Sequence, residues 1–170
     1  SGFGGGGGGS AARLRQERQL EQQGQRSLQV GDWEGAERAY RLLIQRHSSN
    51  PAVYSNLAAL LAMRGCTEEL EPLLRQALAL QPQDPVVLNN LGQVLVQRGA
   101  VEEAEAHFAA AVERDGAYPQ ALTNLANLWV QRGALQEAIA LYRRALAVVP
   151  EQQQRMGEVP GMDGLPEAER

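Results

Sequence analysis

Apolar side chains recur along this chain with the spacing of amphipathic helices. Within residues 85–98, Leu88, Leu91 and Leu95 lie three or four positions apart, as one face of a helix requires. No segment shows the strict alternation of apolar and polar residues that is typical of a half-buried strand. The pattern predicts helices at about 14–30, 33–46, 51–64, 67–80, 85–98, 101–114, 119–132 and 135–149.

The helical pattern repeats with a period of 34 residues. The pair Asn56-Leu57 recurs at residues 90–91 and 124–125, and a proline opens the last three units at residues 51, 85 and 119. A fixed period of this length is typical of a solenoid, in which each helical hairpin buries its apolar face against its neighbours. We expect the hairpins to turn at glycines that adopt left-handed backbone angles, namely Gly31, Gly65, Gly99 and Gly133.

The repeated units resemble tetratricopeptide repeats. The pattern is clearest in the fourth unit, which carries Leu122, Leu125, Ala126, Trp129, Gly133, Ala138, Tyr142, Ala145 and Pro150. The resemblance implies an all-α fold, a right-handed α-solenoid of four helix-turn-helix hairpins. It also implies a protein-interaction scaffold that catalyses no reaction. We expect small residues such as Gly92, Ala104, Ala126 and Ala138 to lie where helices approach closely.

The register divides the chain into a repeat domain and two flanking segments. Residues 1–12 are rich in glycine and read as a flexible linker. The repeat domain covers residues 13–152, with repeats at about 17–50, 51–84, 85–118 and 119–152, the first being a polar cap. Residues 153–170 contain proline and glycine and are expected to be disordered. Pro72 falls one turn inside a predicted helix and is expected to kink it.

Composition narrows the range of functions. The formal net charge is −4, which leaves no strong positive field, so we expect neither nucleic acid nor a membrane surface as partner. All 16 basic residues are arginine. The absence of lysine excludes lysine-based phosphate loops and Schiff bases. Cys66 is the single cysteine, which excludes an intrachain disulfide, and His47 and His107 lie in no metal-ligand spacing. We therefore expect a cytoplasmic protein without cofactor or metal.

The candidate binding residues are uncharged polar side chains on the first helix of each unit. In the family resembled, this helix lines the concave surface of the superhelix. Asparagine amides can both donate to and accept from a peptide main chain, so a row of them could hold an extended segment. The row is similar to the asparagine ladder of O-linked N-acetylglucosamine transferases, although a merely solvated polar face is the open alternative. The candidates are Asn56, Asn90, Asn124, Ser55, Asn89, Thr123, Gln93 and Asn127.

Other interaction and catalytic sites find less support in the sequence. The carboxylate clamp of some tetratricopeptide cochaperones uses lysine and arginine on these helices, whereas this chain has uncharged residues such as Ser55, Asn90 and Gln120. The acidic residues at 68, 69 and 71, and at 102, 103 and 105, could pass for catalytic pairs. We interpret them instead as solvated acids that favour the positive ends of their helices.

The sequence leaves three functions open. The first is a scaffold that binds an extended peptide segment in its concave groove. The second is the substrate-presenting region of a larger glycosyltransferase or sulfotransferase. The third is self-association through the C-terminal helix, which carries Leu141, Leu146 and Val149 and is followed by a segment with few apolar residues.

Overall fold

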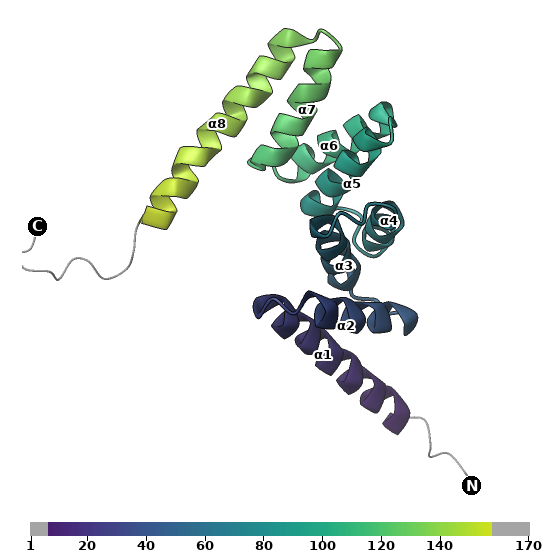
Figure 1. Cartoon of the computed structure of the whole chain (residues 1–170). Helices are drawn as coiled ribbons and strands as arrows, with labels where there is room; N and C mark the ends of the chain where they lie inside the picture. Colours follow the sequence, from purple (N-terminus) through teal and green to yellow (C-terminus); the bar gives the residue numbers. More distant parts are fainter. Residues whose placement is uncertain (1–6, 158–170) are drawn as a thin grey trace, which may run out of the picture.

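The computed structural model describes residues 7–157, and within that range it is an all-α solenoid of four hairpins (Figure 1). The expected fold class is therefore confirmed. Figure 1 shows the hairpins following one another from the first helix at the bottom to the last two at the top. The helices are α1 (Gly7–Gln29), α2 (Trp33–Gln45), α3 (Pro51–Met63), α4 (Leu70–Leu80), α5 (Pro85–Gln97), α6 (Val101–Arg114), α7 (Pro119–Gln131) and α8 (Leu135–Gly157).

The turn inside each hairpin is built on a left-handed glycine. The φ angles of Gly31, Gly65, Gly99 and Gly133 lie between 75° and 81°, a region that side chains disfavour. The amide of the residue after each glycine bonds back across the helix end, as where the Ala100 N–H donates to the Leu95 carbonyl at 2.9 Å. The predicted turns are confirmed, and they leave the two helices of a unit antiparallel.

Close packing inside a hairpin depends on one pair of facing positions. A Cβ atom at Gly92 would lie 2.5 Å from Cε1 of Phe108, so the phenyl ring rests directly on the glycine backbone. The second unit places Ala58 and Leu74 at the same two positions, and both are buried. A larger residue on the inner helix thus accompanies a smaller one on the outer helix, which keeps the packing density constant.

The hairpins are joined into one core where each outer helix meets the next inner helix. These contacts join α2 to α3, α4 to α5, and α6 to α7. Ala104, Ala126 and Ala138 are fully buried, and Gly92 is buried as well, which confirms that the small positions lie at helix contacts. Among the described residues, no helix is long and apolar enough to span a bilayer.

Both ends of the domain differ from the sequence expectation. Helix α1 begins at Gly7, within the segment assigned to the linker, because the alanines and arginines from Ala11 onward allow the helix to propagate backward. Helix α8 runs through Pro150 to Gly157, past the end near residue 149 that the sequence predicts. Residues 1–6 and 158–170, which the linker and tail assignments also cover, lie outside the described residues.

The second unit also departs from the expected helix boundaries. Helix α4 begins at Leu70 rather than near residue 67, so Pro72 lies in its first turn. An N–H in the first turn has no intrahelical acceptor, and the proline therefore costs no helical hydrogen bond there. The effect of Pro72 is a late helix start in place of the expected kink.

Candidate functional site

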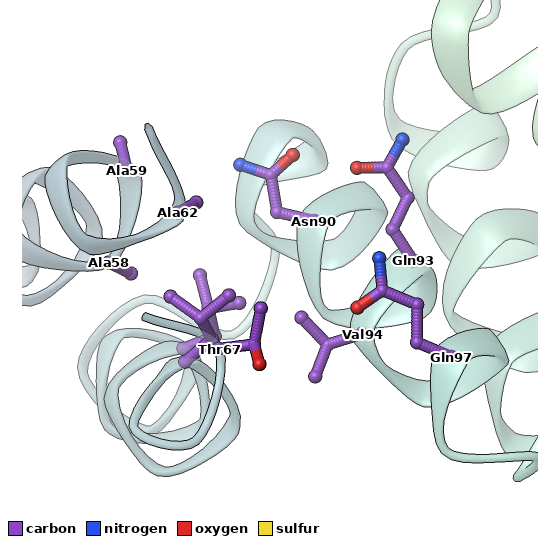
Figure 2. Close-up of a pocket in the computed structure, with 10 residues that line it drawn as sticks. Ala58, Ala59, Ala62, Thr67, Asn90, Gln93, Val94 and Gln97 are labelled. Carbon is purple, nitrogen blue, oxygen red and sulfur yellow. The ribbon is translucent and has the colours of Figure 1, made fainter. Parts of the chain in front are cut away.

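Two adjoining hollows open along the inner helices α3, α5 and α7, and together we call them the groove. The first hollow, of about 240 Å³, lies between α3, α4 and α5. Figure 2 shows the small side chains of α3 on one side of it and the amides of α5 on the other, with Thr67 below. It is lined by Ala58, Ala59, Ala62, Thr67, Leu70, Leu74, Asn90, Gln93, Val94 and Gln97.

The second hollow repeats the first one unit further along. It has a volume of about 390 Å³ and lies between α5, α6 and α7. Nearly every lining residue is the one 34 positions after a residue of the first hollow, so that Asn124 replaces Asn90 and Phe108 replaces Leu74. It is lined by Gln93, Val96, Gln97, Phe108, Asn124, Asn127, Leu128 and Gln131. The two hollows are therefore equivalent sites that repeat with the 34-residue period of the sequence.

Four of the predicted binding residues line these hollows. Asn90 and Gln93 belong to the first hollow, and Gln93, Asn124 and Asn127 to the second. Gln93 is shared, because it lies on the middle helix. Three further candidates, Ser55, Asn56 and Thr123, are partly exposed on α3 and α7 but lie outside the two hollows.

Asn89 is the candidate that the structure removes from the groove. Its side chain is only 2% exposed, and its Oδ1 accepts a hydrogen bond of 2.9 Å from Nδ2 of Asn124. Its own Nδ2 lies 3.5 Å from the hydroxyl of Tyr118. Successive side chains on a helix point about 100° apart, so the neighbour of Asn90 turns into the contact with α7. The side chain of Asn89 therefore lies in the contact between α5 and α7 and outside the groove, unlike the position that the sequence interpretation gave it.

Tyrosine hydroxyls hold two other amides in place. Nδ2 of Asn56 donates to the Tyr40 hydroxyl at 3.5 Å, and the Tyr142 hydroxyl donates to Oδ1 of Asn127. Burial raises the pKa of Tyr40, so this phenol stays neutral. These contacts restrict the amide rotamers beside the groove, which lowers the entropy lost when a ligand binds them.

A ladder of ion pairs lies at the turn end of the hairpins, and the sequence interpretation missed it. Glu37, Glu71 and Glu105 are 34 residues apart on the outer helices. Each forms an ion pair with the arginine that follows the inner helix of the next hairpin. Arg98 Nη1 lies 2.7 Å from Glu71, and Arg132 Nη1 lies 2.7 Å from Glu105. Arg64 pairs with Glu37 in the same way. The signal was present as a glutamate and an arginine that keep a constant separation of 27 residues.

A second set of ion pairs joins neighbouring outer helices. Arg41 forms two hydrogen bonds with Glu69, of 2.9 and 3.0 Å, and Arg75 donates to Glu103 at 2.8 Å. These hydrogen bonds lower the pKa of Glu69 and of Glu103. Of the acids that we interpreted as merely solvated, Glu69 and Glu103 are therefore paired with arginines from the preceding unit, and Glu71 and Glu105 with arginines from the following one.

The charges of the repeats thus gather away from the groove. The thirteen residues of each inner helix from α3 to α7 include no charged side chain, and neither hollow is lined by one. Among the side chains that the structure describes, no three of histidine, cysteine, aspartate or glutamate gather where they could hold a metal ion. The chemistry that the groove offers consists of amide hydrogen bonds and apolar contact.

Comparisons with known proteins agree with this arrangement. The chain matches the tetratricopeptide repeat family at residues 22–85, 71–120 and 89–153. Among solved structures, MamA is similar with a TM-score of 0.71 and 16% identity, over 85% of this chain and 84% of that one. No curated protein matches the chain.

Two further solved structures are similar. YrrB, described as a TPR protein with an unusual peptide-binding site, has a TM-score of 0.64 and 19% identity, over 78% of this chain and 69% of that one. A mutant of the Thermobaculum terrenum O-GlcNAc transferase has a TM-score of 0.57 and 28% identity, over 68% of this chain but 22% of the enzyme. At 16% and 19% sequence identity, the likeness to MamA and YrrB shows a shared fold and nothing further. Since the family match and the repeated hairpins coincide, this chain is a member of the tetratricopeptide repeat family.

Proposed function

We propose that the protein is an interaction scaffold that holds an extended peptide segment in the groove. The observation that carries this proposal is the pair of equivalent hollows, each with an apolar floor and a rim of amides. The amides can bond to a peptide main chain whatever its side chains are, and the floors can cover apolar side chains. A scaffold of this kind needs no catalytic group.

The rigidity of the groove supports the same proposal. Its amides project from two helices, α5 and α7, that belong to one packed core, and Asn124 and Asn127 are held by Asn89 and Tyr142. Binding sites on packed helices lose little conformational freedom when they are occupied. We therefore expect the groove to be preorganised, with the same conformation before and after a ligand binds.

The test is selection from a displayed library of random peptides, followed by calorimetric titration of the selected sequences. A bulky side chain at the side of the first hollow, in Ala62→Trp, should weaken their binding at least tenfold. Ala79→Trp is the matched control, because Ala79 is exposed on the outer helix α4. Failure to select any peptide, or equal affinity for both variants and the parent, would contradict a peptide-binding groove.

A second candidate function is presentation of substrate to a catalytic domain. It is favoured by the likeness to the O-GlcNAc transferase, in which the region similar to this chain makes up 22% of that chain. The groove would then hold the acceptor polypeptide while another domain performs the reaction. The full reading frame tests this idea: a transferase domain on the same polypeptide supports it, and a frame that encodes only the repeats rejects it.

We further infer that two copies of the chain associate through α8. Leu146 is 70% exposed, whereas Ile44, Leu78 and Val112 at the equivalent position are packed against the core. Ile139, which is 40% exposed, replaces the glutamate of the ion-pair ladder.

The outward face of α1 carries Gln19, Gln23 and Arg26 where later units have apolar residues, so it offers α8 no apolar partner. Two α8 faces therefore suit each other best.

Leu146→Glu should abolish this association. A carboxylate at the centre of an apolar contact would lose its hydration without gaining a partner. Sedimentation velocity over a concentration series should show the parent shifting from monomer to dimer and the variant remaining monomeric. Leu80→Glu, at a site 43% exposed on α4, should behave as the parent does. A parent that stays monomeric at every concentration would contradict the inference.

A further inference from the structure

We propose that the groove selects uncharged segments that carry two apolar side chains three residues apart. This inference rests on the proposed function and specifies the ligand. It follows from two properties of the inner helices, namely their lack of charge and the spacing of the two hollows.

The lack of charge decides which segments are accepted. A charged peptide side chain that enters either hollow would lose hydration, and the residues that line the hollows offer it no opposite charge. The nearest arginines at the turn end, such as Arg98 and Arg132, are engaged by Glu71 and Glu105. Main-chain groups and apolar side chains, by contrast, find partners in the amides and in the floors. The groove thus rejects charged segments while binding neutral ones.

The spacing of the hollows decides where the apolar side chains must lie. The hollows are related by one repeat, which is the step from one inner helix to the next. Helices α5 and α7 touch at the Asn124–Asn89 hydrogen bond, and helices in contact lie about 8–10 Å apart. At ~3.3 Å per residue, about three residues of extended chain cover that step. In a polyproline II conformation every third side chain returns to the same side of the chain. A segment with apolar residues at positions i and i+3 therefore presents both of them to the groove at once.

The experiment introduces a negative charge at Gln93, one of the two residues that line both hollows. Random-peptide libraries are selected in parallel on the parent, on Gln93→Glu and on Gln76→Glu. Gln76 is exposed on the outer helix α4, which makes the third protein a matched control. Peptides selected on the parent should have an uncharged central stretch with apolar residues at i and i+3. Gln93→Glu should instead enrich lysine or arginine between the two apolar residues, and the control should repeat the parent's motif.

Salt dependence provides an independent measurement. Because salt screens only interactions between charges, the affinity of the parent for its selected peptides should change less than about twofold between 0.05 and 0.5 M NaCl. Parent-selected peptides with a conserved charge in the central stretch, or an affinity that falls about tenfold with salt, would overturn the inference. If such charged peptides still lose affinity with Ala62→Trp, peptide binding in the groove stands and only the proposed selectivity fails. If no peptide binds at all, both proposals fail.

Discussion

Gly92→Ala is expected to destabilise the protein, and Phe108→Leu is expected to restore it. The new Cβ would lie 2.5 Å from a ring carbon of Phe108, which is only 2% exposed and cannot swing away. Overpacking of this kind costs about 1–3 kcal/mol, which exceeds the gain of about 1 kcal/mol in helix propensity. The double variant recreates the pair that the second unit already uses, Ala58 with Leu74.

The measurement is a double-mutant cycle by chemical denaturation. Phe108→Leu alone should destabilise the parent by about 1 kcal/mol, because it leaves a small cavity, yet it should stabilise the Gly92→Ala variant. The two changes should thus be coupled by up to about 3 kcal/mol. Gly24→Ala is a graded control, because its Cβ would lie 3.0 Å from the Tyr40 ring and should cost less. Additive effects of the two changes would show that these side chains do not determine the hairpin contact.

Replacing the row of asparagines is expected to give the largest loss of peptide affinity. A neutral hydrogen bond contributes on the order of 1 kcal/mol, so the triple alanine variant of Asn56, Asn90 and Asn124 should bind selected peptides roughly 100-fold more weakly. Only Asn90 and Asn124 line the hollows, and Asn56 contributes if the peptide continues past the first hollow along α3. Calorimetric titration with the library-selected peptides measures the loss.

The structure indicates that the triple alanine variant should also lose stability. Asn124 is a donor to the buried Asn89, and its removal leaves that amide oxygen unsatisfied, at a cost of about 1–3 kcal/mol. The triple variant should therefore be less stable as well as weaker in binding. The double variant of Asn56 and Asn90 keeps this hydrogen bond and removes only two long ones of 3.5 Å, to Tyr40 and from Asn89, so it should lose affinity roughly 30-fold at a smaller cost in stability. With Gln76→Ala as control, unchanged affinity in the double variant would rule out the amide row as a peptide contact.

The sequence alone predicted the parts of the fold that repeat. The left-handed glycines, the prolines that open inner helices and the apolar spacing are local requirements of a helical hairpin, so residues such as Gly99 and Pro85 could be interpreted without any tertiary contact. The resemblance to the family followed from the same period, and the choice of the inner helices as the expected binding surface followed from that resemblance. Backbone preferences and the helical spacing of apolar residues can be predicted from the sequence, because both depend on residues only a few positions apart.

What the tertiary structure decided concerns contacts between units and the ends of the domain. Asn89 and Asn90 are adjacent in sequence, and only the packing of α5 against α7 shows that one is buried while the other lines the groove. The pairing of Arg98 with Glu71 joins residues 27 positions apart, beyond the reach of any local rule. Helix α8 continues through Pro150, where both the low helix propensity of proline and the closing proline of the repeat pattern predict an end. Side-chain partners depend on how the hairpins stack, and stacking is a property of the three-dimensional core.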